Sequence, residues 1–189
     1  MTQNAIDAVY PWKRPGTVLS GPHKVVMYDI DASSLDARVS RETIEFNIAA
    51  GQFWRTMGRR HVTRVKVFHN PFLQERFARL KQQAHDHAGA PYAQEVFVFH
   101  GTTAKNAERI VREGFRVDVP VRCGRVYGTG IYCAKSPRTP IAYAGGAKFV
   151  LLCKALMGRD GVDSTLPRHD WVLFKTGAQL LPCYAVYYQ

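Results

Sequence analysis

The stretch from residue 96 to residue 143 places the strongest constraint on the fold of this chain. Residues 96–99 (VFVF) form an apolar run of β-branched and aromatic residues, which is typical of a buried strand. The run ends in His100 and Gly101, and a glycine-flanked segment at residues 128–132 (GTGIY) follows it. The sequence therefore predicts a β-rich unit in which one strand delivers a His-Gly pair at its tip.

These residues suit a flat, polar ligand. Gly101 has no side chain, so a ligand can approach its backbone N–H and C=O groups closely. A carboxamide needs one donor and one acceptor side by side, and a glycine peptide unit supplies both. Tyr132 and Tyr143 can stack on the two faces of a planar ring. We therefore interpret the segment as a pocket for a nicotinamide ring.

Other classes of site fit the sequence less well. Residues 128–130 are not typical of a phosphate-binding loop, because strand-like residues follow them and no helix start receives a phosphate. The four cysteines, at positions 123, 133, 153 and 183, form neither a C-x-x-C nor a Cys/His zinc pattern. They predict reduced thiols, no metal site and a cytoplasmic or nuclear protein. The apolar runs are shorter than a signal peptide or membrane span requires, so we expect a soluble protein without membrane contact.

Composition sets the size of the domain and the charge of its surface. At 189 residues and 46% hydrophobic content, the chain can bury one substantial core. We expect an N-terminal extension at residues 1–22 and one domain at residues 23–189. Lysine and arginine number 26 against 15 acidic residues, a net charge of +11. This charge favours contact with polyanions, and it serves equally well to attract an anionic dinucleotide.

The remaining pattern predicts a mixture of strands and helices. Strands are expected at residues 24–30, 62–68, 95–100, 148–157, 171–174 and 179–188. Helices are expected to begin after three caps, Ser40, Asn70, and Thr102 or Thr103. The first helix is expected to turn four residues inward: Ile44, Ile48, Ala49 and Phe53. Because strands and helices do not alternate regularly, the fold class is α+β rather than a doubly wound sheet.

The order of these motifs resembles the catalytic domain of the poly(ADP-ribose) polymerase (PARP) family. The resemblance extends upstream to residues 67–73 (VFHNPFL) and downstream to residues 150–152, and it covers roughly residues 24–189. It implies the ADP-ribosyltransferase fold, with two packed, mostly antiparallel sheets that form an NAD cleft flanked by short helices. It also implies an NAD-dependent ADP-ribosyltransferase that releases nicotinamide, needs no metal and uses NAD as its donor.

The resemblance assigns roles by position. His100, Tyr132 and Asp170 would form the catalytic triad, with His100 bonded to the adenosine-side ribose. The backbone of Gly101 would hold the nicotinamide amide, and Tyr132 and Tyr143 would stack on the ring. Further donor-binding positions are Thr102, Asn106, Arg116 and Thr139.

Two departures from the family pattern bear on activity. The family places Glu or an apolar residue at the third triad position. Asp170 fits the Glu place, but one extra residue before Gln179 leaves Trp171 as the alternative. Aspartate is one methylene shorter, so we expect transfer of single ADP-ribose units rather than chain growth. The family also has Ser where Pro140 stands, so Thr139 or Ser136 substitutes, or Gly101 holds the amide alone.

The sequence leaves several alternatives open. An NAD-dependent RNA 2′-phosphotransferase shares the general fold and would suit the positive charge, whereas Tyr132 favours the PARP-like branch. A degenerate module that binds NAD or ADP-ribose without turnover is a second alternative. We expect a protein acceptor, and the net charge of +11 also permits a nucleic-acid acceptor. The sequence does not indicate an oligomeric state.

Overall fold

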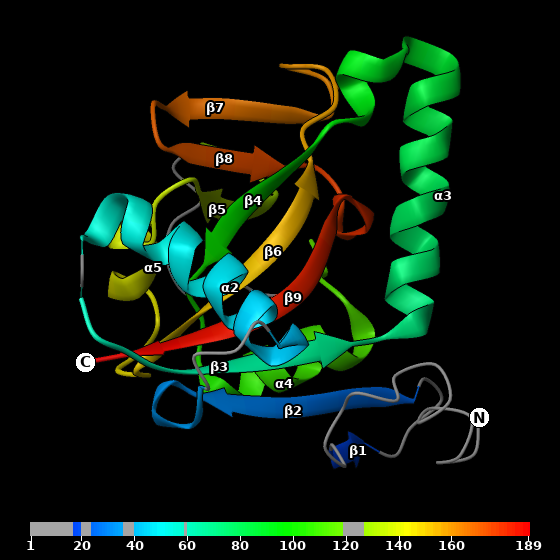
Figure 1. Cartoon of the computed structure of the whole chain (residues 1–189). Helices are drawn as coiled ribbons and strands as arrows, with labels where there is room; N and C mark the ends of the chain where they lie inside the picture. The colour runs from blue at the N-terminus through cyan, green and yellow to red at the C-terminus, as the bar shows by residue number, and fades with distance from the viewer. Residues whose placement is uncertain (1–16, 20–23, 36–39, 59, 119–126) are drawn as a thin grey trace.

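The computed structural model describes residues 17–19, 24–35, 40–58, 60–118 and 127–189 (Figure 1). Within these ranges the strands join one nine-stranded sheet in the order β1-β2-β3-β9-β6-β4-β5-β8-β7, and every neighbouring pair is antiparallel. In that order the strands are Thr17–Leu19, Val25–Asp31, Val62–His69, Leu180–Tyr188, Phe149–Leu156, Glu95–His100, Ile131–Ala134, Trp171–Phe174 and Ser164–Arg168.

The α+β class is confirmed, and one detail of the predicted architecture differs. Two packed sheets were expected, whereas the described strands form one continuous ladder. The central strands β9 and β6 join the two halves, because they pair with each other from Phe149 to Ala155. On its other edge β9 pairs with β3, and β6 pairs with β4. The predicted extension at residues 1–22 lies mostly outside the described residues, and its Thr17–Leu19 pairs with β2.

Four α-helices accompany the sheet in the described part of the chain: α2 (Arg41–Met57), α3 (Pro71–Ala88), α4 (Ala104–Glu113) and α5 (Arg138–Ala142). Short 3-10 turns occur at Ala32–Ser34, Ala90–Ala93 and Gly177–Gln179. The predicted caps of α2 and α3 are confirmed, since Ser40 accepts from the Thr43 N–H and Asn70 from the Leu73 N–H. Thr103 rather than Thr102 caps α4.

Helices cover both faces of the sheet (Figure 1). On one face, residues of α2 pack against β2, β3, β6 and β9, and on the other, residues of α4 pack against β4, β5, β6 and β8. Strand β6 shows the alternation that this requires, because Val150 and Leu152 join the α2 core while Leu151 and Cys153 join the α4 core. A third cluster lies under α3, where Leu73 packs with Leu156.

The buried face of α2 corrects part of the prediction. Ala49 and Phe53 are buried as expected, but Ile44 and Ile48 are 47% and 39% exposed. The stripe that packs on the sheet runs through Phe46, Ala49, Ala50 and Phe53. At roughly 100° per residue the two isoleucines lie on the opposite side of the helix from Phe46. Ile44 and Ile48 do lie on one side of the helix, as their spacing predicts. The opposite side faces the core because Phe46 and Phe53 lie there and aromatic side chains bury more area.

The described residues also bear on the cysteines, on membrane-spanning helices and on metal binding. Cys133, Cys153 and Cys183 are free thiols, and Cys123 lies outside the described residues. Within those residues, no helix combines the length and the apolar character that crossing a bilayer requires. The same part of the chain contains no group of three or more side chains arranged to bind a metal ion.

Candidate functional site

His100 stands at the end of β4 and is fixed against the neighbouring strand. Its Nδ1 lies 2.9 Å from the backbone carbonyl oxygen of Tyr132. Because a carbonyl only accepts, Nδ1 carries the proton in this contact, and Nε2 of the neutral ring is left as an acceptor. The ring also packs edge-on against Phe115, with 5.0 Å between centroids.

The surroundings of His100 keep its ring neutral. Burial lowers the pKa of His100 below its ordinary value of 6.5, and the hydrogen bond to Tyr132 offsets only part of that effect. A neutral imidazole with a fixed tautomer can accept a hydrogen bond from a ligand hydroxyl through Nε2. His100 therefore offers an acceptor at the tip of β4, which is a position suited to a sugar.

Gly101 follows His100 and lies directly against α5. A Cβ atom at this position would come within 1.7 Å of the carbonyl oxygen of Pro140, so the site excludes every residue except glycine. The same carbonyl accepts the backbone N–H of Tyr143 at 3.0 Å. The end of β4 and the end of α5 are therefore brought together at one point, the Pro140 carbonyl.

Tyr132 lies on β5, and its phenol is held by the turn before that strand. The hydroxyl donates to the Gly128 carbonyl at 2.9 Å and accepts from the Tyr127 N–H at 3.1 Å. These two bonds fix the orientation of the ring. Tyr143, at the end of α5, is 53% exposed, so its ring is accessible from solvent.

Asp170 occupies the turn between β7 and β8, beside the segment that leads into α5. Its carbonyl accepts the Lys135 N–H at 2.8 Å, and the Ser136 N–H donates to its carboxylate. Burial raises the pKa of Asp170 above 3.8, against the opposing effects of the Ser136 bond and of nearby basic side chains: His169, Lys135 and Arg138. Asp170 is thus a half-buried carboxylate in a basic setting.

Trp171, the alternative for the third triad position, is bonded to α5 and packed against Tyr127. Its Nε1 donates to Thr139 Oγ1 at 3.2 Å, and its ring packs edge-on against Tyr127 at 5.8 Å. The Arg168 guanidinium lies over the indole, 5.4 Å from its centroid, and donates to the Tyr127 hydroxyl at 2.7 Å. Because the indole is a donor only, Asp170 is the one of the two neighbours that can supply a carboxylate, and the choice between Asp170 and Trp171 stays a prediction.

Three of the hydroxyl residues predicted for donor binding lie on α5 or near it, and their bonding differs. Thr139 lies on α5 and accepts the Trp171 bond, and Ser136 is buried with its hydroxyl accepting from the Arg138 N–H. Thr102 is adjacent in sequence to Gly101 but only 8% exposed. Both Ser136 and Thr139 keep a hydroxyl proton to donate.

Asn106 and Arg116 are not joined to this group of residues. Asn106 is exposed in the first turn of α4, and the Arg116 guanidinium makes two bonds to Asp118, at 3.0 and 2.7 Å. In the hydrogen bonds and ion pairs of the described residues, neither side chain contacts His100, Tyr132 or Asp170. Their assignment to the adenosine side stays a prediction.

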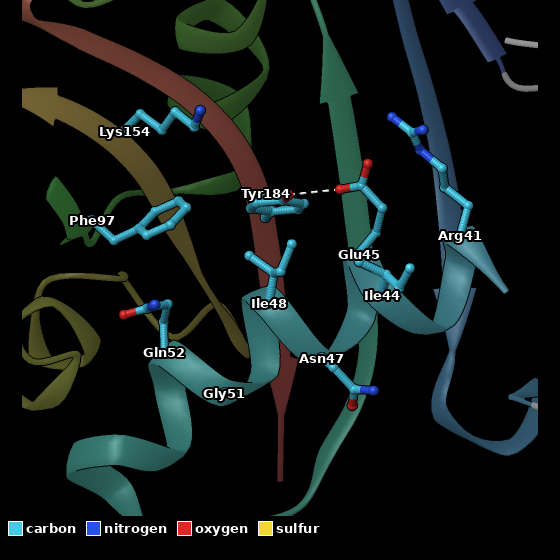
Figure 2. A pocket seen from close by; sticks show the side chains of 10 residues that line it. All are labelled: Arg41, Ile44, Glu45, Asn47, Ile48, Gly51, Gln52, Phe97, Lys154 and Tyr184. Carbon is cyan, nitrogen blue, oxygen red and sulfur yellow. Dashed lines mark hydrogen bonds between the residues drawn. The ribbon is translucent and has the colours of Figure 1, made fainter. Parts of the chain in front are cut away.

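A separate open groove lies between α2 and the sheet (Figure 2). Figure 2 shows Ile48, Phe97 and Tyr184 turned toward one another across it, and the Tyr184 hydroxyl donates to Glu45 Oε2 at 2.6 Å. Burial and this bond raise the pKa of Tyr184 well above its ordinary range. None of the residues predicted for donor binding lines the groove. It is therefore a surface feature distinct from the site at His100.

Comparisons with known proteins concern the same region of the chain. The family described as the poly(ADP-ribose) polymerase catalytic domain matches residues 43–170. A poly [ADP-ribose] polymerase tankyrase from Caenorhabditis elegans is 37% identical over 79 residues, which is 39% of this chain and 4% of that protein. The protein mono-ADP-ribosyltransferase PARP11 of Mus musculus is 33% identical over 97 residues, and that of Homo sapiens is 34% identical over 94 residues.

The matched segments are short parts of these relatives. The alignments with PARP11 cover 51% and 50% of this chain and 29% and 28% of the mouse and human proteins. The chain therefore spans less than a third of the length of the curated relatives that it matches. The family match includes His100, Gly101, Tyr132, Tyr143 and Asp170 within its bounds.

Proposed function

Because this chain belongs to the poly(ADP-ribose) polymerase catalytic-domain family, we propose that it transfers single ADP-ribose units from NAD⁺ to a protein acceptor and releases nicotinamide. The observation that carries this proposal is the junction of β4, β5 and α5. His100 is bonded to Tyr132, and Gly101 abuts the Pro140 carbonyl at the base of Tyr143. The family match spans all three segments.

The residues at this junction fit the donor. The neutral His100 presents Nε2 as an acceptor for a ribose hydroxyl. Gly101 lacks a Cβ, so its peptide units can approach the nicotinamide amide closely. The exposed ring of Tyr143 and the fixed ring of Tyr132 supply faces for stacking. We assign the donor site to these four residues.

Asp170 supplies the charge that the reaction needs. Transfer breaks the bond between the nicotinamide nitrogen and the ribose carbon, and the electron pair leaves with nicotinamide. The acceptor nucleophile then forms its bond to the same carbon and loses its proton. A carboxylate near the sugar stabilises the positive charge that develops there. In this role Asp170 acts in its ionised form, while Trp171 donates to Thr139 and packs against Tyr127.

Two features favour single-unit transfer. Aspartate reaches one methylene less far than glutamate, and a misplacement of about 1 Å costs on the order of a hundredfold in rate. Two of the relatives are named as mono-ADP-ribosyltransferases. The acceptor class rests on the family, and the net charge of +11 makes phosphorylated nucleic-acid ends the second acceptor to test.

Mass spectrometry of the protein with candidate acceptors after incubation with NAD⁺ tests the proposal. We expect mass increases of one ADP-ribose unit per modified site, together with nicotinamide release that Asp170→Ala abolishes. Long polymer on a gel would contradict single-unit transfer. Thermal stabilisation by NAD⁺ without nicotinamide release, in wild type and variant alike, would instead identify a binding module.

A further inference from the structure

Helix α5 is too short to be stable without contacts to the rest of the protein. It has five residues, Pro137 precedes it without a side-chain cap, and Pro140 lies within it. Isolated helices of this length are not stable in water, since nucleation costs more than a few backbone bonds return. Its place beside Gly101 is therefore set by contacts with other elements.

The first contact ties α5 to the end of α2. The Arg138 Nε and Nη2 atoms both donate to the Thr56 carbonyl, at 3.2 and 3.1 Å. Thr56 is in the last turn of α2, where carbonyl groups lack partners within the helix and carry the negative end of its dipole. The planar fork of a guanidinium suits this contact, and an ammonium cannot reproduce it.

The second contact ties α5 to β8. Trp171 Nε1 donates to Thr139 Oγ1 at 3.2 Å. The indole is itself fixed, because Tyr127 packs against it edge-on and the Arg168 guanidinium lies over it. A rigid donor on a strand thus holds the hydroxyl of the residue that precedes Pro140.

Both contacts act on the part of α5 that meets the donor site. The Pro140 carbonyl touches Gly101 and also accepts the Tyr143 N–H, so any shift of α5 moves both features together. We propose that Trp171 and Arg138 are positioning residues, which hold α5 so that Pro140 stays against Gly101 and Tyr143 is presented to NAD⁺. This inference rests on the proposed function and adds residues that reach the donor only through α5.

The bond between Trp171 and Thr139 can be tested by removing its donor and its acceptor in turn. Trp171→Phe keeps a ring and loses the N–H, whereas Thr139→Val keeps the branched shape and loses the hydroxyl. We expect each to raise the Kd and KM for NAD⁺ about fivefold, the factor that matches one neutral hydrogen bond. The double variant should be no weaker than either single variant, because both remove one bond. Thr139→Ser, which retains the hydroxyl, should restore wild-type binding.

Arg138→Ala tests the contact with α2 separately from the contact with β8. Because the two contacts are independent, the Kd of the double variant Arg138→Ala/Trp171→Phe should rise by the product of the two single-variant factors. Trp54→Phe is the matched control, since it removes another indole bond, the one from Nε1 to the Arg60 carbonyl at 3.0 Å, and should leave NAD⁺ binding unchanged.

The outcomes separate this inference from the proposed function. Wild type that neither binds NAD⁺ in calorimetry nor releases nicotinamide overturns both. Wild type that does both, with unchanged Kd and KM in Trp171→Phe and Thr139→Val, overturns only the positioning role. A lowered melting temperature in these variants with no change in Kd has the same meaning, because it shows a purely structural bond.

Discussion

Replacing Gly101 with alanine tests whether the site depends on the close approach of β4 and α5. The added Cβ would lie 1.7 Å from the Pro140 carbonyl oxygen, whereas real Cβ atoms essentially never come within 3.0 Å of such an atom. The two segments must therefore separate by about 1.3 Å. The obstacle is backbone, so no change of rotamer relieves it.

This separation predicts a loss of catalysis together with a loss of stability. A displacement of about 1 Å at a reacting centre costs on the order of a hundredfold, so we expect kcat/KM for nicotinamide release to fall by about that factor. Overpacking costs roughly 1–3 kcal/mol, which lowers the Tm by about 2–12 °C for a chain of this size. The measurements are initial rates over a range of NAD⁺ concentrations and a thermal unfolding scan.

Gly51→Ala provides the control for this substitution. Gly51 lies within α2, and a Cβ there would meet nothing within 4 Å. Alanine in a helix interior stabilises by about 0.5–1 kcal/mol relative to glycine, so this variant should keep its activity and unfold at a slightly higher temperature. Wild-type kcat/KM in Gly101→Ala would refute the reasoning, because the clash would then have been absorbed without moving the site.

Three further predictions follow from groups described above. Burial raises the pKa of Asp170, so kcat/KM should fall as the pH drops through a value above 3.8, and Asp170→Asn, which cannot ionise, should be inactive over the same pH range. Burial lowers the pKa of His100, so the unfolded state binds this proton more tightly and the free energy of unfolding should fall as the pH drops below 6.5; urea titrations of His100→Gln should show a smaller fall. Asn70→Ala removes the cap of α3 and two bonds to the carbonyls of Val111 and Arg112, and should cost about 2–4 kcal/mol in urea unfolding.

The parts of the site that the sequence predicts well are contiguous and local. A strand that ends in His100 and Gly101, and a glycine-flanked Tyr132, are readable because each motif carries its own turn or strand signal. Caps were equally readable, since Ser40 and Asn70 bond to N–H groups three residues away. Interactions of this range are encoded in a few neighbouring residues.

Contacts between distant segments were not predicted. The five residues of α5 contain a proline and no periodic apolar pattern, so the helix and its bonds to Thr56 and Trp171 gave no local signal. Strand β7 was missed for a related reason, because Pro167 lies within it and Leu166 is exposed. The bond between Thr139 and Trp171 joins residues 32 positions apart, so it could be recognised only once the fold was known.

The third triad position is a register that the sequence leaves open between two neighbouring residues. Counting back from Gln179 gives Trp171, whereas counting back from Phe174 gives Asp170. Because the two residues are adjacent, one extra residue between Phe174 and Gln179 moves the count from one to the other, and the local sequence carries no signal that chooses between them. The assignment to Asp170 stays a proposal.

The position of β9 in the sheet has a consequence for how the chain is made. This strand follows β3 and β6 in sequence yet lies between them, so both would present bare hydrogen-bonding edges on a ribosome-bound chain that had not yet reached residue 180. Unpaired edges of this kind recruit other chains. Folding of the two halves into one body thus awaits the emergence of β9, and truncation before it should yield an aggregating product that chaperones retain.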